Sequence, residues 1–275
     1  MSAEGAASAA CSEVHLDSEA SEASPSASER HFDVLLFDLD GTLYSADCGY
    51  VAHTRDNMFR YIQDKGWVPE GQSPEEYWRP LFQKYNQSLR GWKAMGHITT
   101  EEECDEYWAY CRKGTADFMP RDDELRFFLE CIPKSTRKYI FTNANEKEAK
   151  EALECLGIAD QFLEVYGSKF MGDVCKPEAL AFHAVLQHLQ DPDPDSSGAT
   201  GIDLKRVCMF EDSYKNLRTA NLLGMGTVFI ESKLTAAEEG VSESDRRILS
   251  AQVSSLSDES GNNRLRKQLP GLFRG

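Results

Sequence analysis

Two acidic residues near the start of the chain have the spacing of a catalytic pair. Asp38 follows four apolar residues, 34–37, which predict a strand buried on both faces, and Asp40 lies two positions further on. Because side chains alternate along an extended backbone, both carboxylates are expected to point the same way. Burying a charge is costly unless it is paired or metal-bound. A hard cation such as Mg2+ would relieve the repulsion between the two acids.

More polar residues occur where later strands are predicted to end. Ligands bind beyond the carboxyl ends of the strands in open α/β sheets, so residues at these ends should converge. Lys176 precedes a proline, which favours extended geometry and suits a side chain aimed into a site. The complete set is Thr142 and Asn143 after the predicted strand 138–141, Glu211, Asp212 and Ser213 after the predicted strand 206–210, and Lys176 before Pro177.

This set of residues predicts phosphoryl transfer. Asp38 and Asp212 can bind Mg2+, which would hold a phosphate oxygen and let an anionic nucleophile approach. Asp38 can attack phosphorus to give an aspartyl-phosphate. Asp40 is placed to protonate the leaving oxygen and then to deprotonate the water that cleaves the intermediate. Hydrogen-bond donors and positive charge for the phosphate oxygens would come from Thr142, Asn143 and Lys176.

Each motif alone also has a purely structural explanation. The acids within 38–41 can be a solvated strand-to-turn junction, and 142–143 can cap the next helix. Residues 211–213 can form a helix N-terminus, where the dipole favours acids, and Lys176 can be a surface lysine. Their joint occurrence at strand ends of one α/β pattern favours catalysis.

The second half of the chain alternates strands and helices around these motifs. This alternation predicts a parallel sheet with right-handed crossovers. Residues 191–198 predict a loop, and 227–230 are expected to close the sheet. The other predicted elements are helices over 145–156, from 177 to about 190 and from 214 to about 223, and a short strand over 162–166.

Residues 47 to about 118 are predicted to be helical throughout. Ser73 with Glu76, and Thr100 with Glu103, have the pattern of capping boxes at helix starts. Apolar and aromatic stripes at helical spacing follow both caps, and such stripes usually pack in a core. The pattern indicates a small helical bundle inserted after the first strand.

The two ends of the chain carry little structural signal. Residues 1–30 are rich in Ala, Ser and Glu, and such a segment is expected to be a disordered acidic tail. Residues 233–275 are polar and weakly helical, and are expected to form a C-terminal tail. The predicted division is therefore a catalytic core over 31–45 and 119–232, a helical domain over 46–118, and tails over 1–30 and 233–275.

Composition narrows the classes of partner. The net charge of -16 and the pI of about 4.8 argue against nucleic-acid polymers and anionic membrane surfaces. No segment approaches the roughly 20 apolar residues of a membrane span. The eight cysteines include no Cys-x-x-Cys pair and show no zinc spacing against the histidines. The acidic N-terminus is unlike a transit peptide. We expect a cytoplasmic protein with reduced thiols and a small phosphorylated metabolite as partner, and the sequence carries no signal for oligomeric state.

The motifs resemble those of the haloacid dehalogenase (HAD) superfamily of Mg2+-dependent phosphohydrolases. Residues 38–42 fit its Asp-x-Asp-x-Thr signature, and the other motifs occur in order at 141–144, 176–177 and 211–213. The resemblance covers about 32 to 231. It implies a Rossmann-like parallel sheet, in which the helical insert corresponds to the C1 cap of the family.

The resemblance also implies a role for each matched residue. Asp38 corresponds to the nucleophile, and Asp40 to the acid/base that also binds metal through its backbone carbonyl. Asp212 completes the metal site, and Glu211 reaches it through water. The branch of the superfamily with the most similar motifs usually has Asp at position 211. The phosphate would be held by Thr142, Lys176 and the amide of Asn143, and Asn216 would brace the loop.

Within the superfamily, the residues of these motifs are most similar to those of the pyrimidine 5'-nucleotidase branch of fungi and plants. The shared residues include 40–44, 89–91, 175–177 and 211–216. This branch implies UMP or CMP as substrate, and pyridoxal phosphate as another, with Arg90 and Gly91 of the cap as candidates for substrate contact. The alternatives are a phosphatase for another small ester such as a sugar phosphate, a phosphomutase, a phospho-acceptor domain and a non-catalytic binding protein. Asp40 weighs against a true dehalogenase, which does not need a general acid.

Overall fold

A computed structural model describes residues 30–190, 201–231 and 241–274, so the expected N-terminal tail and the 191–198 loop lie outside the described residues. The centre of the fold is a parallel sheet of six strands in the order β3-β2-β1-β4-β5-β6. This arrangement confirms the predicted α/β class. The strands are β1 Val34–Phe37, β2 Arg137–Phe141, β3 Val165–Tyr166, β4 Val207–Glu211, β5 Gly226–Ile230 and β6 Ala251–Val253.

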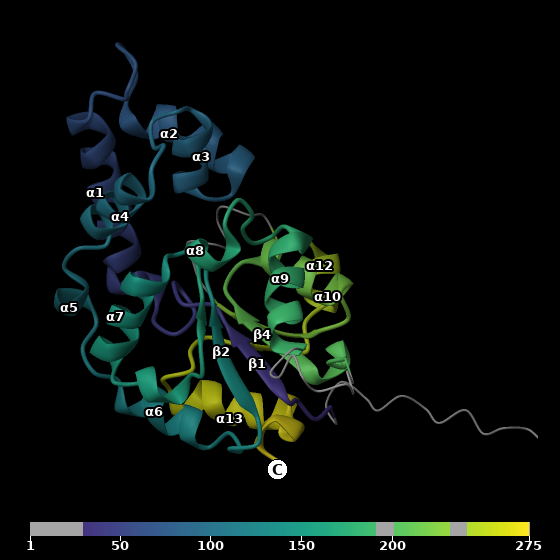
Figure 1. The fold of residues 1–275 in the computed structure, drawn as a ribbon. Helices are drawn as coiled ribbons and strands as arrows, with labels where there is room; N and C mark the ends of the chain where they lie inside the picture. The colour runs from purple at the N-terminus through teal and green to yellow at the C-terminus, as the bar shows by residue number, and fades with distance from the viewer. Residues whose placement is uncertain (1–29, 191–200, 232–240, 275) are drawn as a thin grey trace, which may run out of the picture.

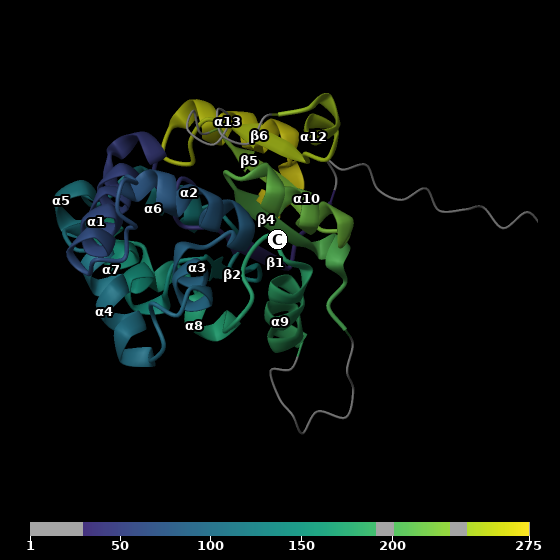
Figure 2. The same ribbon diagram turned by 90° about the horizontal axis from the view of Figure 1, so that it is seen from above.

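Helices cover both faces of the sheet. Leu35 and Phe37 of β1 pack in one apolar cluster with α6, α7 and α13, whereas Val34 and Leu36 pack in another with α9 and α10. The alternation follows from the pleat of the strand. In both views α6 and α7 lie on one side, and α9 and α10 on the other (Figures 1 and 2). The bounds are α6 Asp123–Glu130, α7 Glu146–Leu156, α8 Ser168–Met171, α9 Ala179–Gln190, α10 Tyr214–Leu222, α12 Glu243–Arg247 and α13 Glu259–Gln268.

Four helices between β1 and β2 form what we call the helical insert, residues 50–111. They lie over one end of the sheet (Figure 1) and have an apolar cluster of their own. Both predicted capping boxes are confirmed, because Ser73 and Thr100 each accept a bond from the third helical residue and Glu76 and Glu103 reciprocate. The helices are α1 Tyr50–Asp64, α2 Pro74–Tyr85, α3 Ser88–Ala94 and α4 Glu101–Cys111, followed by the short α5 Thr115–Phe118.

The C-terminal prediction is wrong for the described residues. β5 does not close the sheet, because β6 pairs parallel to it through Val228, Phe229 and Ile230. Leu265 of α13 and Leu272 beyond it are buried in the first cluster, so this segment belongs to the fold and is not a tail. Local sequence patterns indicate neither element, because β6 has only three residues and α13 has one buried leucine among polar neighbours.

Smaller differences occur at element ends. The strand predicted over 162–166 is reduced to β3, and Phe162 instead packs its ring against Phe37, 5.6 Å away between centroids. Glu211 is the last residue of β4 and does not follow the strand. Single turns of 3-10 helix occur at Ala46–Cys48, Ala159–Gln161, Leu204–Arg206 and Pro270–Phe273. None of the helices described between residues 30 and 274 combines the length and the apolar character that crossing a bilayer requires.

Candidate active site

The four sequence motifs meet at the carboxyl end of the sheet. They surround a cavity of about 250 Å³, which we call the core cavity. Phe82 and Asn86 of the helical insert form part of its wall. The core residues that line it are Asp38, Asp40, Thr142, Asn143, Lys176, Pro177, Glu211, Asp212, Ser213, Lys215 and Asn216.

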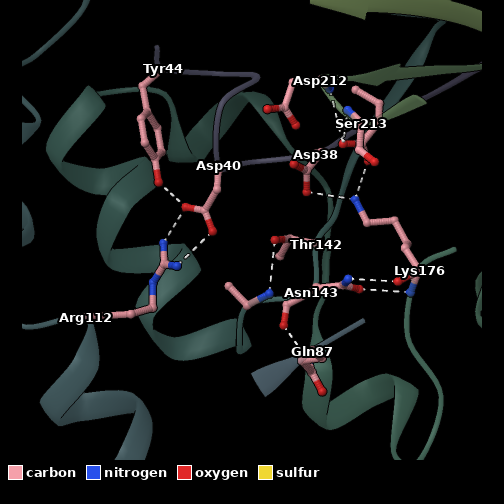
Figure 3. Close-up of polar contacts among 12 residues, drawn as sticks. Asp38, Asp40, Tyr44, Gln87, Arg112, Thr142, Asn143, Lys176, Asp212 and Ser213 are labelled. Atoms are coloured by element: carbon pink, nitrogen blue, oxygen red, sulfur yellow. Dashed lines mark hydrogen bonds and ion pairs between the residues drawn. The ribbon is translucent and has the colours of Figure 1, made fainter. Parts of the chain in front are cut away.

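Lys176 lies at the centre of the polar contacts in this cavity (Figure 3). Its side chain is only 1% exposed, and its Nζ donates to Oδ1 of Asp38 at 2.8 Å and to Oε2 of Glu211 at 2.7 Å. Burial would lower the pKa of Lys176, but the two carboxylates outweigh it and raise the pKa. The ammonium therefore keeps its charge and holds β1 and β4 together at their ends.

Three carboxylates share this end of the sheet. Oxygens of Asp38, Glu211 and Asp212 lie within 4.8 Å of one another. Burial, and next the charge of Glu211, raise the pKa of Asp38 to about 7 although Lys176 opposes the shift. One ammonium among three acids leaves an excess of negative charge. This set of oxygen donors fits Mg2+ or a similar hard cation.

The backbone allows Asp212 to approach the first motif closely. Gly41 has a φ of +81°, and a Cβ atom there would collide with the carboxylate of Asp212. Glycine is therefore needed both for the left-handed turn and for the space. Glu211 fixes the other side of the loop, because its Oε1 accepts from the amides of Asp212 and Ser213, each at 3.2 Å.

Thr142 and Asn143 lie directly after β2 and do not cap α7. That cap is Asn145, whose side chain accepts from the amide of Glu148 at 3.1 Å. Asn143 instead exchanges two hydrogen bonds with the backbone of Lys176, at 2.9 and 3.0 Å. The side chain of Asn143 therefore holds the lysine loop in place, which the sequence did not indicate.

Asp40 lines the same cavity but is held differently from Asp38. Arg112, which ends α4, donates to Oδ2 and Oδ1 of Asp40 at 2.8 and 2.7 Å, and the Tyr44 hydroxyl donates to Oδ1. In Figure 3 the Asp40 carboxylate is turned toward Arg112, and that of Asp38 toward Lys176. Burial would raise the pKa of Asp40, but the guanidinium outweighs it and the pKa is lowered. The two acids are thus held by separate cations.

A second cavity, of about 310 Å³, extends from this point into the helical insert, and we call it the insert chamber. It shares Asp40, Phe82, Asn86 and Asn143 with the core cavity, so the two adjoin. Four aromatic side chains form part of its walls. The insert residues that line it include Arg55, Met58, Trp78, Phe82, Gln87, Tyr107 and Trp108.

The two predicted cap residues have other neighbours. Arg90 donates to Glu178, to the carbonyl of Tyr85 at 3.0 Å and to Sγ of Cys175 at 3.0 Å, so it ties the insert to the core. Gly91 lies against Leu81, whose Cβ would be 3.2 Å from a Cβ on the glycine. Neither residue is among the described residues that line the two cavities.

Sequence reasoning missed Arg112, Tyr44 and Gln87. Gln87 is buried and donates to the carbonyl of Asn143 at 2.6 Å, a second tie between insert and core. Tyr44 lies four residues after Asp40, and that spacing was the only local signal for it. The other two contacts join residues 56 and 72 positions apart, which no local pattern marks.

Comparison with known proteins assigns the family. A family model described as haloacid dehalogenase-like hydrolase matches residues 32–224. The chain therefore belongs to the haloacid dehalogenase-like hydrolase family. No curated protein gives a significant match.

Several solved structures are similar to this chain at low sequence identity. CbbY from Rhodobacter sphaeroides, in complex with xylulose-1,5-bisphosphate, is 16% identical with a TM-score of 0.58, covering 88% of this chain and 99% of its own. The magnesium-bound HAD hydrolase YfnB from Bacillus subtilis is 16% identical (TM-score 0.48, coverage 82% and 96%). The L-2-haloacid dehalogenase from Xanthobacter autotrophicus is 17% identical (TM-score 0.47, coverage 82% and 96%).

Proposed function

We propose that this protein is a Mg2+-dependent phosphomonoester hydrolase that works through an aspartyl-phosphate on Asp38. The observation that carries the proposal is the buried ammonium of Lys176 between Asp38 and Glu211, with Asp212 beside them, at the floor of a cavity. A buried lysine with two acids is costly to maintain for stability alone. Its charge is well placed for a phosphoryl group, whose oxygens need positive partners.

The residues would divide the chemistry as follows. The carboxylate of Asp38 attacks phosphorus, while Thr142, the amide of Asn143 and Lys176 hold the phosphate oxygens. The oxygens of Asp38, Asp212 and the backbone carbonyl of Asp40 would hold Mg2+, with Glu211 acting through water. When bound, the ion would offset the negative charge of the acids and of the phosphate.

Asp40 would move the protons in both half-reactions. Once turned from Arg112, it would take up a proton from solvent and give it to the leaving oxygen as Asp38 becomes phosphorylated. It would then take a proton from the water that cleaves the intermediate. Because its oxygens are engaged by Arg112 and Tyr44, it must turn from these partners to reach a leaving group.

The helical insert would act as a C1-type cap and select the leaving group. The insert chamber adjoins the core cavity and is walled by Trp78, Phe82, Tyr107 and Trp108, which suit a flat aromatic ring. We therefore propose a nucleoside 5'-monophosphate of the pyrimidine type, such as UMP or CMP. The described cysteines are all free thiols, which fits a cytoplasmic location.

A phosphate-release assay with Mg2+ tests the proposal. The substrates are UMP, CMP, AMP, pyridoxal phosphate and sugar phosphates, the last because CbbY holds a sugar bisphosphate. Net release separates a phosphatase from a phosphomutase. We expect release by wild type and by the exposed control Asp56→Asn, and none by Asp38→Asn or after treatment with EDTA. Continued turnover without Asp38 or without metal would refute the mechanism.

A further inference from the structure

Arg112 has an unusual place for an arginine. Its side chain is 6% exposed, and both of its terminal nitrogens bind the carboxylate of Asp40. Its backbone is fixed, because its carbonyl accepts from the hydroxyls of Tyr50 at 2.7 Å and Thr115 at 3.0 Å. The guanidinium lies 5.3 Å from the centre of the Tyr50 ring. Any change at this site therefore takes place in the side chain and not in the backbone.

A second buried carboxylate interacts with the same guanidinium through its charge. Glu148, in the first turn of α7, is 4% exposed. Among the described residues, its Oε2 and the Nε of Arg112 are buried without a hydrogen-bond partner. Burial raises the pKa of Glu148, and the charge of Arg112 is one of the interactions that oppose this shift. A buried carboxylate gains most from a guanidinium that pairs with it.

The Asp40 side of this arrangement faces the proposed substrate route. Asp40 and Arg112 line the insert chamber, and Asp40 also lines the core cavity. A group that enters the chamber therefore meets the Arg112–Asp40 pair before it reaches Asp38.

Building on the proposed phosphatase function, we propose that Arg112 is a positioning residue with two carboxylate partners. It holds Asp40 turned toward the insert in the free protein. When a leaving group fills the insert chamber, the guanidinium moves to Glu148 and Asp40 turns toward the substrate. Arg112 thereby makes the acid/base available only to esters that fill the chamber. No bond to phosphorus is made or broken by this movement.

Turnover of two esters tests the release of Asp40. UMP should fill the chamber, and methyl phosphate leaves it empty. Arg112→Gln should reduce the ratio of kcat for UMP to kcat for methyl phosphate by about tenfold, which is part of the roughly 10²–10⁴-fold that a general acid contributes. Arg112→Lys keeps the charge but not the paired hydrogen bonds, so its ratio of kcat values should lie between those of wild type and Arg112→Gln. Equal loss on both esters would mean that Arg112 is merely structural, and would overturn the proposal.

Glu148 tests the second partner. Glu148→Gln should lower kcat for UMP several-fold with little change in KM, because the released guanidinium loses a charged partner. Glu154→Gln, on the exposed face of the same helix, is the matched control and should behave as wild type. The double variant with Arg112→Gln should turn over UMP no more slowly than Arg112→Gln alone. If Glu148→Gln lowers kcat for UMP as much in the Arg112→Gln background as in wild type, the proposal is overturned.

Thermal unfolding separates this inference from the proposed function. If wild type releases phosphate from no ester, the proposed function fails but the exchange of partners is still measurable. Asp40→Asn removes the first partner, so Arg112 should then depend on Glu148. Glu148→Gln should therefore lower Tm by more in the Asp40→Asn background than in wild type. An equal shift in the two backgrounds would overturn the exchange.

Discussion

Lys176 shows how one side chain can serve both the fold and the site. Its ammonium is buried between Asp38 and Glu211, which lie at the ends of two different strands of the sheet. Such an arrangement contributes less to stability than apolar packing would, yet removing one partner leaves uncompensated buried charge. The site therefore depends on all its members at once.

Replacing Lys176 should make this dependence measurable. Lys176→Met keeps most of the length of the side chain but leaves Asp38 and Glu211 close together without a cation. We expect the free energy of unfolding in EDTA to fall by about 3–5 kcal/mol, measured by urea denaturation. Mg2+ should restore part of the loss. Lys215→Met, at an exposed lysine of the same cavity, is the control; a similar loss in both variants would contradict this account.

At the scale of elements, those determined by local sequence could be predicted, and those determined by tertiary packing could not. The capping boxes at Ser73 and Thr100 were predictable because every group involved lies within four residues. β1 was predictable because a strand buried on both faces is apolar throughout. β6 and α13 were not predictable, because β6 is short and α13 is mostly polar. Both are held in place by packing in the first apolar cluster.

The role of α13 can be tested through its one buried leucine. Leu265 is fully buried against the sheet, so Leu265→Ala should lower the free energy of unfolding by about 2–5 kcal/mol. Leu222→Ala, at a leucine that is 84% exposed, should change it by less than about 0.5 kcal/mol. Chemical denaturation measures both. A neutral Leu265→Ala would indicate that the C-terminal segment does not contribute to the core.

At the scale of the whole molecule, the topology brings together residues that are distant in sequence. Asp38 and Asp212 meet because β1 and β4 are neighbours in the sheet. The sequence predicted this, since each acid follows an apolar strand and parallel strands end at one edge. It could not predict Arg112 or Gln87, because their contacts depend on how the insert packs on the core.

A metal bound across these strands should stabilise the folded chain as a whole. At a Mg2+ concentration of about 100 times Kd, the gain of about 2.7 kcal/mol should raise Tm by roughly 5–10 °C. Asp212→Asn should remove most of the shift, and the exposed Asp56→Asn should keep it. Differential scanning calorimetry in EDTA and in Mg2+ gives the comparison. An unchanged wild-type Tm would contradict the metal site.

The aromatic residues packed within the helical insert have a practical consequence. All four tryptophans of the chain, at positions 67, 78, 92 and 108, belong to the helical insert. Tryptophan emission therefore reports on the helical insert alone, while tyrosines such as Tyr139 and Tyr166 lie in the sheet. A denaturation curve recorded at tryptophan wavelengths would follow the insert, and circular dichroism would follow the complete chain. Any offset between the two curves would measure how far the insert can melt on its own.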